Sequence, residues 1–358
     1  MKARFFDILK EVEREHEQGT GSSKDSHLMI IDGLNTFIRV FSAVPALNDD
    51  GDHIGGVTGF LRSIAANIRQ HKPTRCVIVF DGKGGSRRRK DLYPEYKANR
   101  ANKTAFNRNQ EFASLEDEQD SMKRQFGRLI QYLNCLPITT LSIDNVEADD
   151  IMAYIANEIY TKDENRATIV STDRDFLQLV NNRISVWSPI KKKLYTPSVM
   201  REEFGISSNN YLLYRTFIGD KSDNIPGLKG VGLKSLLKHF PIITQNEDLS
   251  VEQIVEYAES VDKKYKVHEN VISNKDLLDL NYRLMQLKEV DINGNAKMLA
   301  LNMVKGDINK MNTFEFKKMF MRDKMYTVIK DLDSWLNNSF NSLITSHGVS
   351  CTCRTASL

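Results

Sequence analysis

Short apolar runs that end in carboxylates are the most constraining feature of this chain. Three such runs are each followed at once by aspartate: 28–31 by Asp32, 76–80 by Asp81, and 167–172 by Asp173 and Asp175. β-Rich runs of this kind are typical of buried parallel strands, and in open α/β sheets functional groups collect outside the carboxyl ends of the strands. The sequence therefore predicts a mostly parallel central sheet, flanked by helices, with four aspartates along one edge.

Two further segments contribute five more carboxylates. The first opens a helical stretch at 151–156, and the second lies in the glycine-rich segment 219–227. Their acids are Glu147, Asp149, Asp150, Asp220 and Asp223. Packed together without counter-charge, the nine carboxylates would repel one another and raise one another's pKa values. We therefore expect divalent metal ions among them.

The composition excludes several classes of protein. With 358 residues, of which 41% are hydrophobic and 27% charged, the chain can bury a substantial core. Four scattered cysteines, of which Cys76 lies in a predicted strand, are too few for a disulfide framework. No apolar stretch approaches the roughly 20 residues that span a bilayer, and charges stand where a signal peptide would be apolar. We expect a cytoplasmic protein without a membrane segment.

A basic segment follows Asp81 directly. Residues 82–103 contain eight cations and two anions, although the net charge of the chain is only +3. A charge run is usually just a solvated surface, but its position beside the predicted metal site favours a polyanionic substrate. Residues 83–110 are also nearly free of aliphatic side chains. We therefore predict that this segment projects from the body and folds on contact with a substrate.

Pattern changes along the chain divide it into four parts. Strand and helix patterns alternate over 27–204, and helical patterns dominate over 205–344. Residues 1–26 are predicted to be an extension with a short amphipathic helix, and 345–358 to be a flexible tail.

Glycines separate two predicted helices, 211–218 and 233–240. The loop 219–234 includes Gly227, Gly230 and Gly232. Glycines spaced in this way before a helix let backbone amides approach a phosphate, and the helix dipole favours the anion. Many tight turns share the spacing, so a simple turn remains the more economical explanation of this loop in isolation.

Together these segments resemble the 5′ nuclease family: flap endonucleases, the 5′ exonuclease domain of bacterial DNA polymerase I and, especially, stand-alone bacteriophage 5′-3′ exonucleases. The resemblance covers about residues 27–242, and its motifs occur in the family's order. They are 31–33, 80–82, 93–100, 146–150, 171–175 and 219–232. The resemblance implies a PIN-like nuclease core, a helical arch at 82–125 and a helix-hairpin-helix-type DNA-binding region in 205–344.

The resemblance also implies two magnesium ions, for which manganese can substitute. The positions around the first metal would be Asp32, Asp81, Glu147 and Asp149, and those around the second Asp149, Asp150, Asp173, Asp175, Asp220 and Asp223. Oxygen ligands select such hard cations, and the absence of His and Cys among them disfavours zinc. A potassium ion at the glycine-rich loop would be held by the main-chain carbonyls of Phe217, Ile218, Pro226, Leu228 and Val231.

Further roles carried over from the family fall on the basic segment and the loop. Lys97 and Arg100 would act in catalysis with Asp81 and Asp173, and Tyr96 would stack on a base. Positions 96 and 100 are four apart, so they would meet on one face of a helix. The expected DNA contacts are Lys83, Arg87, Arg88, Arg89, Tyr96, Lys97, Arg100, Gly227, Lys229, Gly230, Gly232 and Lys234.

The function implied is a structure-specific 5′ nuclease that cleaves phosphodiesters near single-strand/duplex junctions by two-metal catalysis. Expected substrates are DNA with a 5′ flap, nick or 5′ end and RNA–DNA hybrids, in replication and RNA-primer removal. No polymerase domain follows, so we expect a stand-alone monomer that meets replication proteins such as a single-strand-binding protein.

Two alternatives remain open. PIN-like ribonucleases share acids at strand ends but generally lack a glycine-rich duplex-binding loop, so segment 219–232 disfavours them. A non-catalytic junction-binding protein would retain the fold without the chemistry, and the presence of all nine acids disfavours that.

Overall fold

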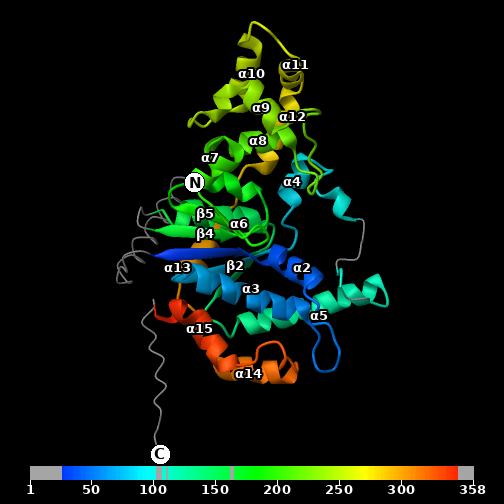
Figure 1. Ribbon diagram of the computed structural model, residues 1–358, viewed down its shortest axis with the longest axis vertical. Coiled ribbons are helices and arrows are strands. Elements are labelled where there is room, and N and C mark those ends of the chain that lie inside the picture. The colour runs from blue at the N-terminus through cyan, green and yellow to red at the C-terminus, as the bar shows by residue number, and fades with distance from the viewer. Residues whose placement is uncertain (1–25, 102–106, 110–111, 162–164, 346–358) are drawn as a thin grey trace, which may run out of the picture.

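The computed structural model describes residues 26–101, 107–109, 112–161 and 165–345 (Figure 1). The predicted N-terminal extension and C-terminal tail fall almost entirely outside these ranges, so the predictions about them lie outside the described residues.

Six strands form one sheet in the order β3-β2-β1-β4-β5-β6, with β6 antiparallel to β5 and every other pair parallel. They are β1 (His27–Asp32), β2 (Arg75–Asp81), β3 (Thr139–Ile143), β4 (Arg166–Val170), β5 (Ile184–Ser188) and β6 (Lys193–Tyr195). The three strands predicted from the acid-ended runs are β1, β2 and β4, which are neighbours in the sheet. The predicted mostly parallel α/β fold is confirmed.

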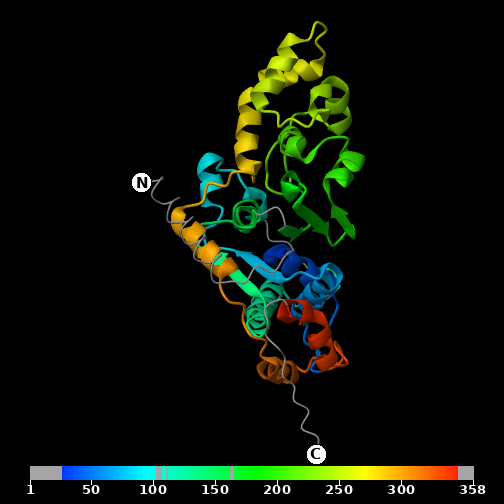
Figure 2. The same ribbon diagram turned by 90° about the vertical axis from the view of Figure 1, so that its left-hand side faces the viewer.

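Both faces of the sheet are covered, which explains why its strands are apolar throughout. Alternate side chains of β1 point to opposite faces: Met29 and Ile31 join one buried cluster, whereas Leu28 and Ile30 join the other. On the first face lie α2 (Gly33–Ala43), α3 (Gly55–His71) and α5 (Leu115–Leu133). On the second lie α6 (Ala148–Tyr154), its π-helical continuation η2 (Ile155–Ile159) and α13 (Gly294–Lys305). Figure 2 shows α13 and the pair α2 and α3 on opposite sides of the sheet.

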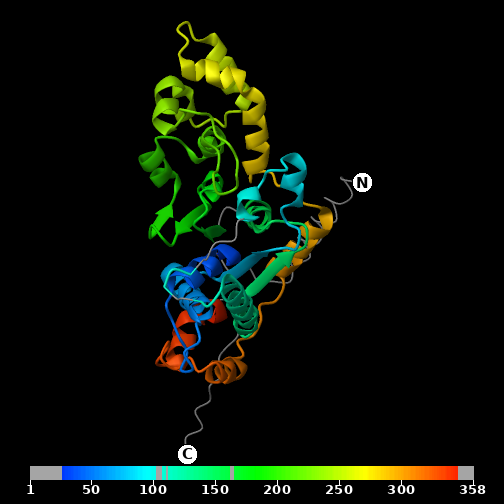
Figure 3. The same ribbon diagram turned by 90° about the vertical axis from the view of Figure 1, so that its right-hand side faces the viewer.

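A helical region stands beyond the sheet and is seen above it in Figures 1 and 3. The predicted helix 211–218 is α8, and 233–240 corresponds to α9 with one residue fewer. The helices are α7 (Pro197–Phe204), α8 (Tyr211–Ile218), α9 (Leu233–His239), α10 (Val251–Ser260), α11 (Lys266–Ser273) and α12 (Lys275–Met285). Short turns are η3 (Asp175–Leu179), η4 (Ser208–Asn210) and η5 (Pro241–Thr244).

The last helices return to the sheet instead of extending this region. After α13, α14 (Thr313–Arg322) packs against α5, where the rings of Tyr132 and Phe316 lie 4.9 Å apart. Helix α15 (Leu332–Thr345) packs on α3. The predicted 205–344 unit is thus divided in space between the helical region and the opposite side of the sheet (Figure 1).

The segment predicted as an arch contains α4 (Arg87–Leu92) and a 3₁₀ turn, η1 (Ala98–Ala101). Its far end lies in α5. The side chain of Gln125 in this helix is buried, and its Oε1 accepts a hydrogen bond from the Gly56 N–H at 2.8 Å. The part of the segment that belongs to α5 therefore packs on the body. Within the described ranges, no helix has both the length and the apolar character that a membrane span requires.

Candidate active site

The carboxyl ends of three adjacent strands bring four predicted acids to one edge of the sheet. Asp32 ends β1 and Asp81 ends β2, while Asp173 and Asp175 follow β4. Because β1 lies between β2 and β4, these side chains share the edge that parallel strands leave for functional groups.

Helix α6 adds its first turn to the same edge. The Ala148 N–H donates to Asp81 Oδ1 at 2.8 Å, so the end of β2 is tied to the start of α6. Glu147 is the N-cap of this helix, and Asp149 and Asp150 occupy its first turn. The positive end of the helix dipole stabilises carboxylates there. This agrees with the prediction that the segment containing Glu147, Asp149 and Asp150 opens a helix.

Asp32 is held by two donors and is almost fully buried. Its side chain caps α2 by accepting from the Asn35 N–H at 3.0 Å, and it accepts from the Ser171 hydroxyl at 3.0 Å. Burial raises the pKa of Asp32 to about 7, and repulsion from Asp173 and Asp81 adds to the rise against the effect of the two hydrogen bonds.

Asp32, Asp149 and Asp173 form a group that we call the central acidic cluster. Burial raises the pKa of Asp149, and repulsion from Asp173 and Asp32 raises it further. Burial also raises the pKa of Asp173, with added repulsion from Asp223 and Asp220. In the described part of the chain, no Lys or Arg forms an ion pair with any of the three. Lys97 and Arg215 act on Asp149 and Asp173 from a distance, so the negative charge gathered here is only partly offset by the protein.

Arg215 neutralises two acids beside this cluster. Its Nε donates to Asp175 Oδ1 at 2.7 Å, and its Nη2 pairs with Asp220. Burial still raises the pKa of Asp175 to about 7, with a contribution from Asp173. Burial acts against ionisation of Asp220 too, but Ser222 and Arg215 hold its pKa below the ordinary value.

The sequence argument missed Arg215, although a signal for it exists. It is the single charged residue of α8, whose other positions are apolar or uncharged, and its side chain is largely buried. A cation placed in an otherwise apolar helix needs a buried partner, so the position alone indicates a pairing with acids.

Arg89 neutralises two other predicted metal ligands. Its guanidinium forms a two-pronged contact with Asp150, at 2.8 and 2.7 Å, and also pairs with Glu147. The Arg89 Nε donates to the main-chain carbonyl of Leu284 at 2.8 Å, at the end of α12. One buried side chain thus joins α4, α6 and the helical region.

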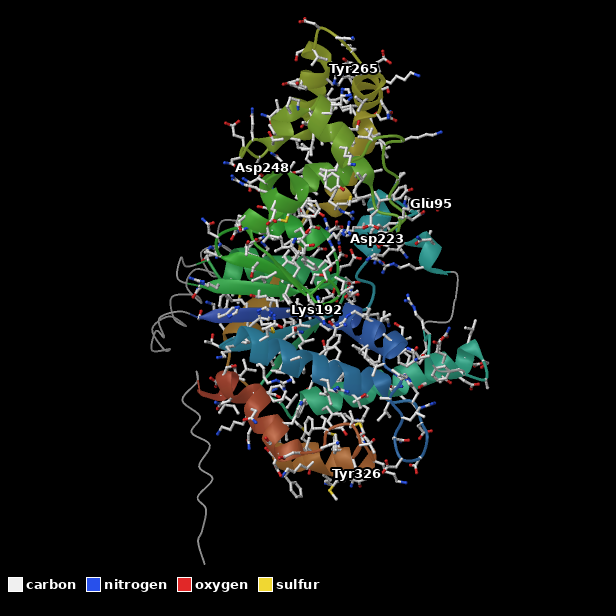
Figure 4. All side chains as sticks on the ribbon, viewed as in Figure 1. Glu95, Lys192, Asp223, Asp248, Tyr265 and Tyr326 are labelled. Carbon is white, nitrogen blue, oxygen red and sulfur yellow. The ribbon has the colours of Figure 1, made fainter. Side chains whose placement is uncertain are left out.

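Lys97 and Arg100 pair with site acids as well. Lys97 Nζ lies 2.6 Å from Glu147 Oε1, and Arg100 pairs with Asp223. Burial favours the neutral acid at Glu147, but Arg89 and Lys97 lower its pKa below the ordinary value. Figure 4 shows Asp223 beside the segment that carries Glu95, consistent with the Lys97 N–H donating to the Asp223 carbonyl at 2.9 Å.

Three expectations about the basic segment need correction. Arg89 was expected to contact DNA, but it is 3% exposed and committed to buried carboxylates. Tyr96 was expected to stack on a base, but it is 2% exposed, and its hydroxyl donates towards Asp223 at 3.1 Å. Residues 96 and 100 do not share an α-helix, because Lys97 has a left-handed φ of 58° and only a 3₁₀ turn follows.

The remaining cations of the segment are more accessible. Lys83 and Arg87 are exposed, Arg88 is half-buried beside Asp150, and the Arg100 side chain retains more than half of its exposure. These groups remain available to a polyanion at the same edge of the sheet.

The glycine-rich loop has an accessible backbone. At Gly230 and Gly232, no atom lies within 4 Å of the place that a Cβ would take, and Lys229 and Lys234 are exposed. Gly227 differs, because a Cβ there would lie 2.2 Å from the Ile218 carbonyl oxygen. Because glycine has no Cβ, the loop can lie against the end of α8 at this position.

The main-chain carbonyls predicted to hold potassium belong to the end of α8 and to the glycine-rich loop, which meet at this contact. The Leu228 N–H donates to the Phe217 carbonyl at 2.8 Å, and the Val231 N–H donates to that of Leu228 at 3.2 Å. The Pro226 carbonyl accepts from Asn281 at 2.7 Å. Each such oxygen has a second lone pair, so these bonds leave room for a cation contact.

The nine predicted carboxylates are suitable ligands for hard divalent cations, but their side chains do not form a complete coordination site. As they stand, the described residues include no group of three or more His, Cys, Asp or Glu arranged to hold a metal ion. Five of the nine acids are instead paired with cations: Arg89, Arg215, Lys97 and Arg100 bind Glu147, Asp150, Asp175, Asp220 and Asp223. The central acidic cluster has no such partner, and carboxylate oxygens are ligands that magnesium and manganese prefer.

Comparison with known proteins gives one family match. Residues 27–205, half of the chain, match the family model described as 5′-3′ exonuclease, N-terminal resolvase-like domain. A 5′-3′ exonuclease of Aquifex aeolicus is 28% identical over 311 residues, which cover 86% of this chain and 95% of that protein. The flap endonuclease Xni of Shewanella sp. strain MR-4 is 29% identical over 76% of this chain and 95% of its own length.

Solved structures agree with the fold. The flap endonuclease D15 of bacteriophage T5, solved as a pseudo-enzyme-product complex with DNA and metal ions, superposes with a TM-score of 0.58. The two are 22% identical, and the match covers 84% of this chain and 99% of the other. The arrangement of sheet and helices described above is therefore shared with that structure.

Proposed function

Because this chain belongs to the 5′-3′ exonuclease family defined by that N-terminal resolvase-like domain, we propose that it is a structure-specific 5′ nuclease. It hydrolyses phosphodiester bonds near junctions of single-stranded and duplex DNA, as a 5′-3′ exonuclease and flap endonuclease. Its place is in DNA replication, including removal of RNA primers. The observation that carries the proposal is the central acidic cluster, which lies at the carboxyl edge of the sheet and forms no ion pair among the described residues.

Two magnesium ions, or manganese in their place, complete the site. The residues that would hold them are Asp32, Asp81, Glu147, Asp149, Asp150, Asp173, Asp175, Asp220 and Asp223. When bound, the metals lower the pKa of the attacking water and neutralise charge on the leaving oxygen. Hydrolysis of this kind is direct, so no protein side chain needs to form a covalent bond to phosphorus.

The protein's own contribution is to orient these carboxylates. The Ser171 hydroxyl and the Asn35 N–H each donate to one oxygen of Asp32 and so fix its side chain at the carboxyl edge of the sheet. Arg215 fixes Asp175 and Asp220 in the same way. Pre-set ligands reduce the reorganisation needed during the reaction, and this is a large part of what an active site supplies.

Lys97 and Arg100 provide positive charge for the scissile phosphate. Both cations lie at the boundary between the acids and the exposed part of the basic segment. Phosphodiesters resist attack because an anionic centre must accept a nucleophile, and the barrier to be removed is of order 20 kcal/mol. Fixed cations beside the phosphate stabilise the charge that develops in the transition state.

The helical region holds the duplex. The exposed backbone of the loop at Gly230 and Gly232 and the charges of Lys229 and Lys234 suit a phosphate backbone. A potassium ion at the carbonyls of the α8 end would add to this grip. Lys83, Arg87 and Arg88 would contact the strand near the site.

The test is cleavage of matched substrates that differ in structure and sugar. A 5′-flap duplex, a nicked duplex, an RNA-primed duplex and an RNA hairpin would be incubated with and without magnesium. We expect cleavage near the junction of the DNA substrates only with the metal. Cleavage confined to the RNA hairpin would favour a PIN-like ribonuclease, and metal-independent binding without product would contradict the proposed activity.

The raised pKa values predict how metal-free stability depends on pH. Asp32 and Asp175, with pKa values of about 7 against 3.8 when unperturbed, bind protons more tightly in the folded chain. Their contribution to stability therefore falls as pH rises from 3.8 to about 7. Magnesium relieves that loss, so we expect it to raise the thermal unfolding temperature more at pH 8 than at pH 5.5.

Thermal unfolding with magnesium or with chelator at both pH values checks this expectation. Histidines with lowered pKa values, such as His27 and His53, act in the opposite sense between these pH values but do so with and without metal. The metal-induced shift is therefore the measured quantity. An equal shift at both pH values, or an unchanged shift in Asp32→Asn, would contradict the assignment.

A further inference from the structure

The last turn of α12 is held by buried side chains of α4 and η3. The final carbonyls of a helix have no partner within it, and two of them accept here from outside. Arg89 Nε donates to the Leu284 carbonyl at 2.8 Å. Gln178 Nε2 donates to the Met285 carbonyl at 3.0 Å, while its Oε1 accepts from the Leu287 N–H at 2.8 Å. The end of α12 is therefore fixed to the edge of the sheet that carries the acids.

Gln178 makes this attachment through the backbone of a predicted metal ligand. It lies in η3, three residues after Asp175, and its Nε2 also donates to the Asp175 main-chain carbonyl at 2.8 Å. The side chain is buried, and both ends of its amide are used in hydrogen bonds. A shift of the end of α12 is therefore transmitted to the segment that places the Asp175 carboxylate.

Asn281 ties the same end of α12 to the glycine-rich loop. Its side chain is completely buried, and its Nδ2 donates to the Pro226 carbonyl at 2.7 Å and to the Thr216 carbonyl at 3.0 Å. Pro226 belongs to the loop, and Thr216 lies in the last turn of α8. Asn281 precedes Met285 by four residues, which is about 6 Å along the helix axis. The loop and the carboxyl edge of the sheet are thus attached to one turn of one helix.

Stability alone explains Asn281 poorly. Among the described residues, its Oδ1 is buried without a hydrogen-bond partner. An unsatisfied buried acceptor lowers the stability of the folded state. The side chain therefore supplies its two donors at a cost, which indicates that the position of the carbonyls it holds matters for function.

This arrangement makes α12 a rigid connection between the two places where DNA is engaged. Figure 3 shows α12, in gold, running from the helical region towards α4, in cyan. The loop holds the duplex backbone and the carboxyl edge carries the chemistry, so the spacing between them selects the phosphodiester that reaches the acids. Successive phosphates of one strand are about 3.4 Å apart along a duplex. A loop displaced by that amount would move the cut by one nucleotide.

We propose that Gln178 and Asn281 are positioning residues that set where the strand is cut. Through the last turn of α12 they fix the glycine-rich loop relative to the carboxyl edge, and this spacing selects one phosphodiester near the junction. The inference rests on the proposed function and adds to it the determinant of the cleavage position. Asn281 lies beyond the family match at 27–205, so this half of the connection is not part of the domain that defines the family.

The variants Asn281→Ala and Gln178→Ala, which remove the amides, test the proposal. A 5′-flap duplex labelled at its 5′ end would be cleaved with magnesium at saturating enzyme, and the products sized to single nucleotides. We expect one main product from the wild type and added products one nucleotide longer and shorter from both variants. The rate at the main position should fall about tenfold in Asn281→Ala, because a misplacement of about 1 Å can cost as much as 10²-fold. The Kd for the duplex should stay unchanged.

The two variants should differ in size and should not be additive. In Gln178→Ala the bond from Arg89 still holds the end of α12, so the spread of products should be smaller. Asn281→Ala already separates α12 from the loop, so the double variant should give the same products as Asn281→Ala alone. An additive spread in the double variant would overturn the proposal.

The matched control is Asn210→Ala. Asn210 is also completely buried in the helical region, and its Nδ2 donates to two main-chain carbonyls, those of Ile243 and Gln245, each at 3.1 Å. These bonds join η4 to η5 and do not involve α12. We expect this variant to lose stability in thermal unfolding but to give the wild-type product.

Product lengths separate positioning from a general loss of stability. Unchanged product lengths in both Asn281→Ala and Gln178→Ala would overturn the proposal, as would the same spread in Asn210→Ala. If Asn281→Ala does not fold, the products of Gln178→Ala decide alone. Absence of cleavage by the wild type would instead contradict the proposed function, and the positioning proposal would fail with it.

Discussion

Asp173→Asn should abolish cleavage, by about 10³-fold or more, while DNA affinity stays nearly unchanged. Asp173 belongs to the central acidic cluster and forms no ion pair among the described residues, although the charge of Arg215 acts on it from a distance. Its Oδ1 accepts from the Asp175 N–H at 2.8 Å, and an asparagine oxygen can accept the same bond. The substitution therefore removes a charge and a metal ligand with little change of shape. Single-turnover cleavage at saturating enzyme, together with equilibrium binding, measures the two effects.

A second readout separates a functional from a structural role for Asp173. Repulsion from Asp173 raises the pKa of Asp149 and of Asp175, so removing its charge relieves an unfavourable interaction. The metal-free variant should consequently unfold at a higher temperature than the wild type at pH 8. Asp120→Asn, at an exposed position outside the site, should change neither cleavage nor stability. Normal turnover by the Asp173 variant would remove this residue from the active site.

The parts of the fold that sequence predicts well are those set by local pattern. The apolar runs before Asp32 and Asp81 form strands, and the acids 147–150 open a helix whose N-cap is Glu147, because strand burial and helix capping depend on near neighbours. Acids at the carboxyl ends of neighbouring parallel strands must meet at one edge of the sheet. The acids of the site that lie at strand ends can therefore be predicted from the sheet topology. For this reason, placing Asp32, Asp81, Asp173 and Asp175 at one edge required no knowledge of tertiary contacts, whereas the roles of the other five acids were implied by the family resemblance.

What sequence does not predict is which acids are neutralised, and by what. Arg215 reaches Asp175 across 40 residues, and Arg89 reaches Asp150 across 61, so the sequence can at most indicate that an arginine has an acidic partner and not which acid it is. Arg89 was grouped with exposed DNA contacts because its neighbours in sequence are basic. The return of α14 and α15 to the sheet is likewise decided by long-range burial, as in the contact of Phe316 with Tyr132.

Arg89→Met should destabilise the fold by about 3–5 kcal/mol, because it removes the buried cation shared by two buried acids and leaves Glu147 with Lys97 alone and Asp150 with the half-buried Arg88 at 3.4 Å. Arg89 is 3% exposed, as are both of its acidic partners, Glu147 and Asp150. Methionine fills a similar volume but supplies neither the charge nor the forked donors, and the bond to the Leu284 carbonyl is lost. Arg87→Met, at an exposed position on the same helix, is the matched control and should change stability by less than about 0.5 kcal/mol. Urea unfolding of the chain measures both.

The cause of this loss can be identified from its pH dependence and from a second substitution. Without Arg89, Glu147 loses the first of the two cations that lower its pKa, so the folded chain binds a proton more readily there and the deficit is larger at pH 8 than at pH 5. Adding Asp150→Asn to Arg89→Met should recover part of the stability, because one unpaired charge disappears. A deficit that is independent of pH and unaffected by the second change would mean that Arg89 acts through packing alone. The pairing of Arg89 with Glu147 would then not be what holds that acid in the site.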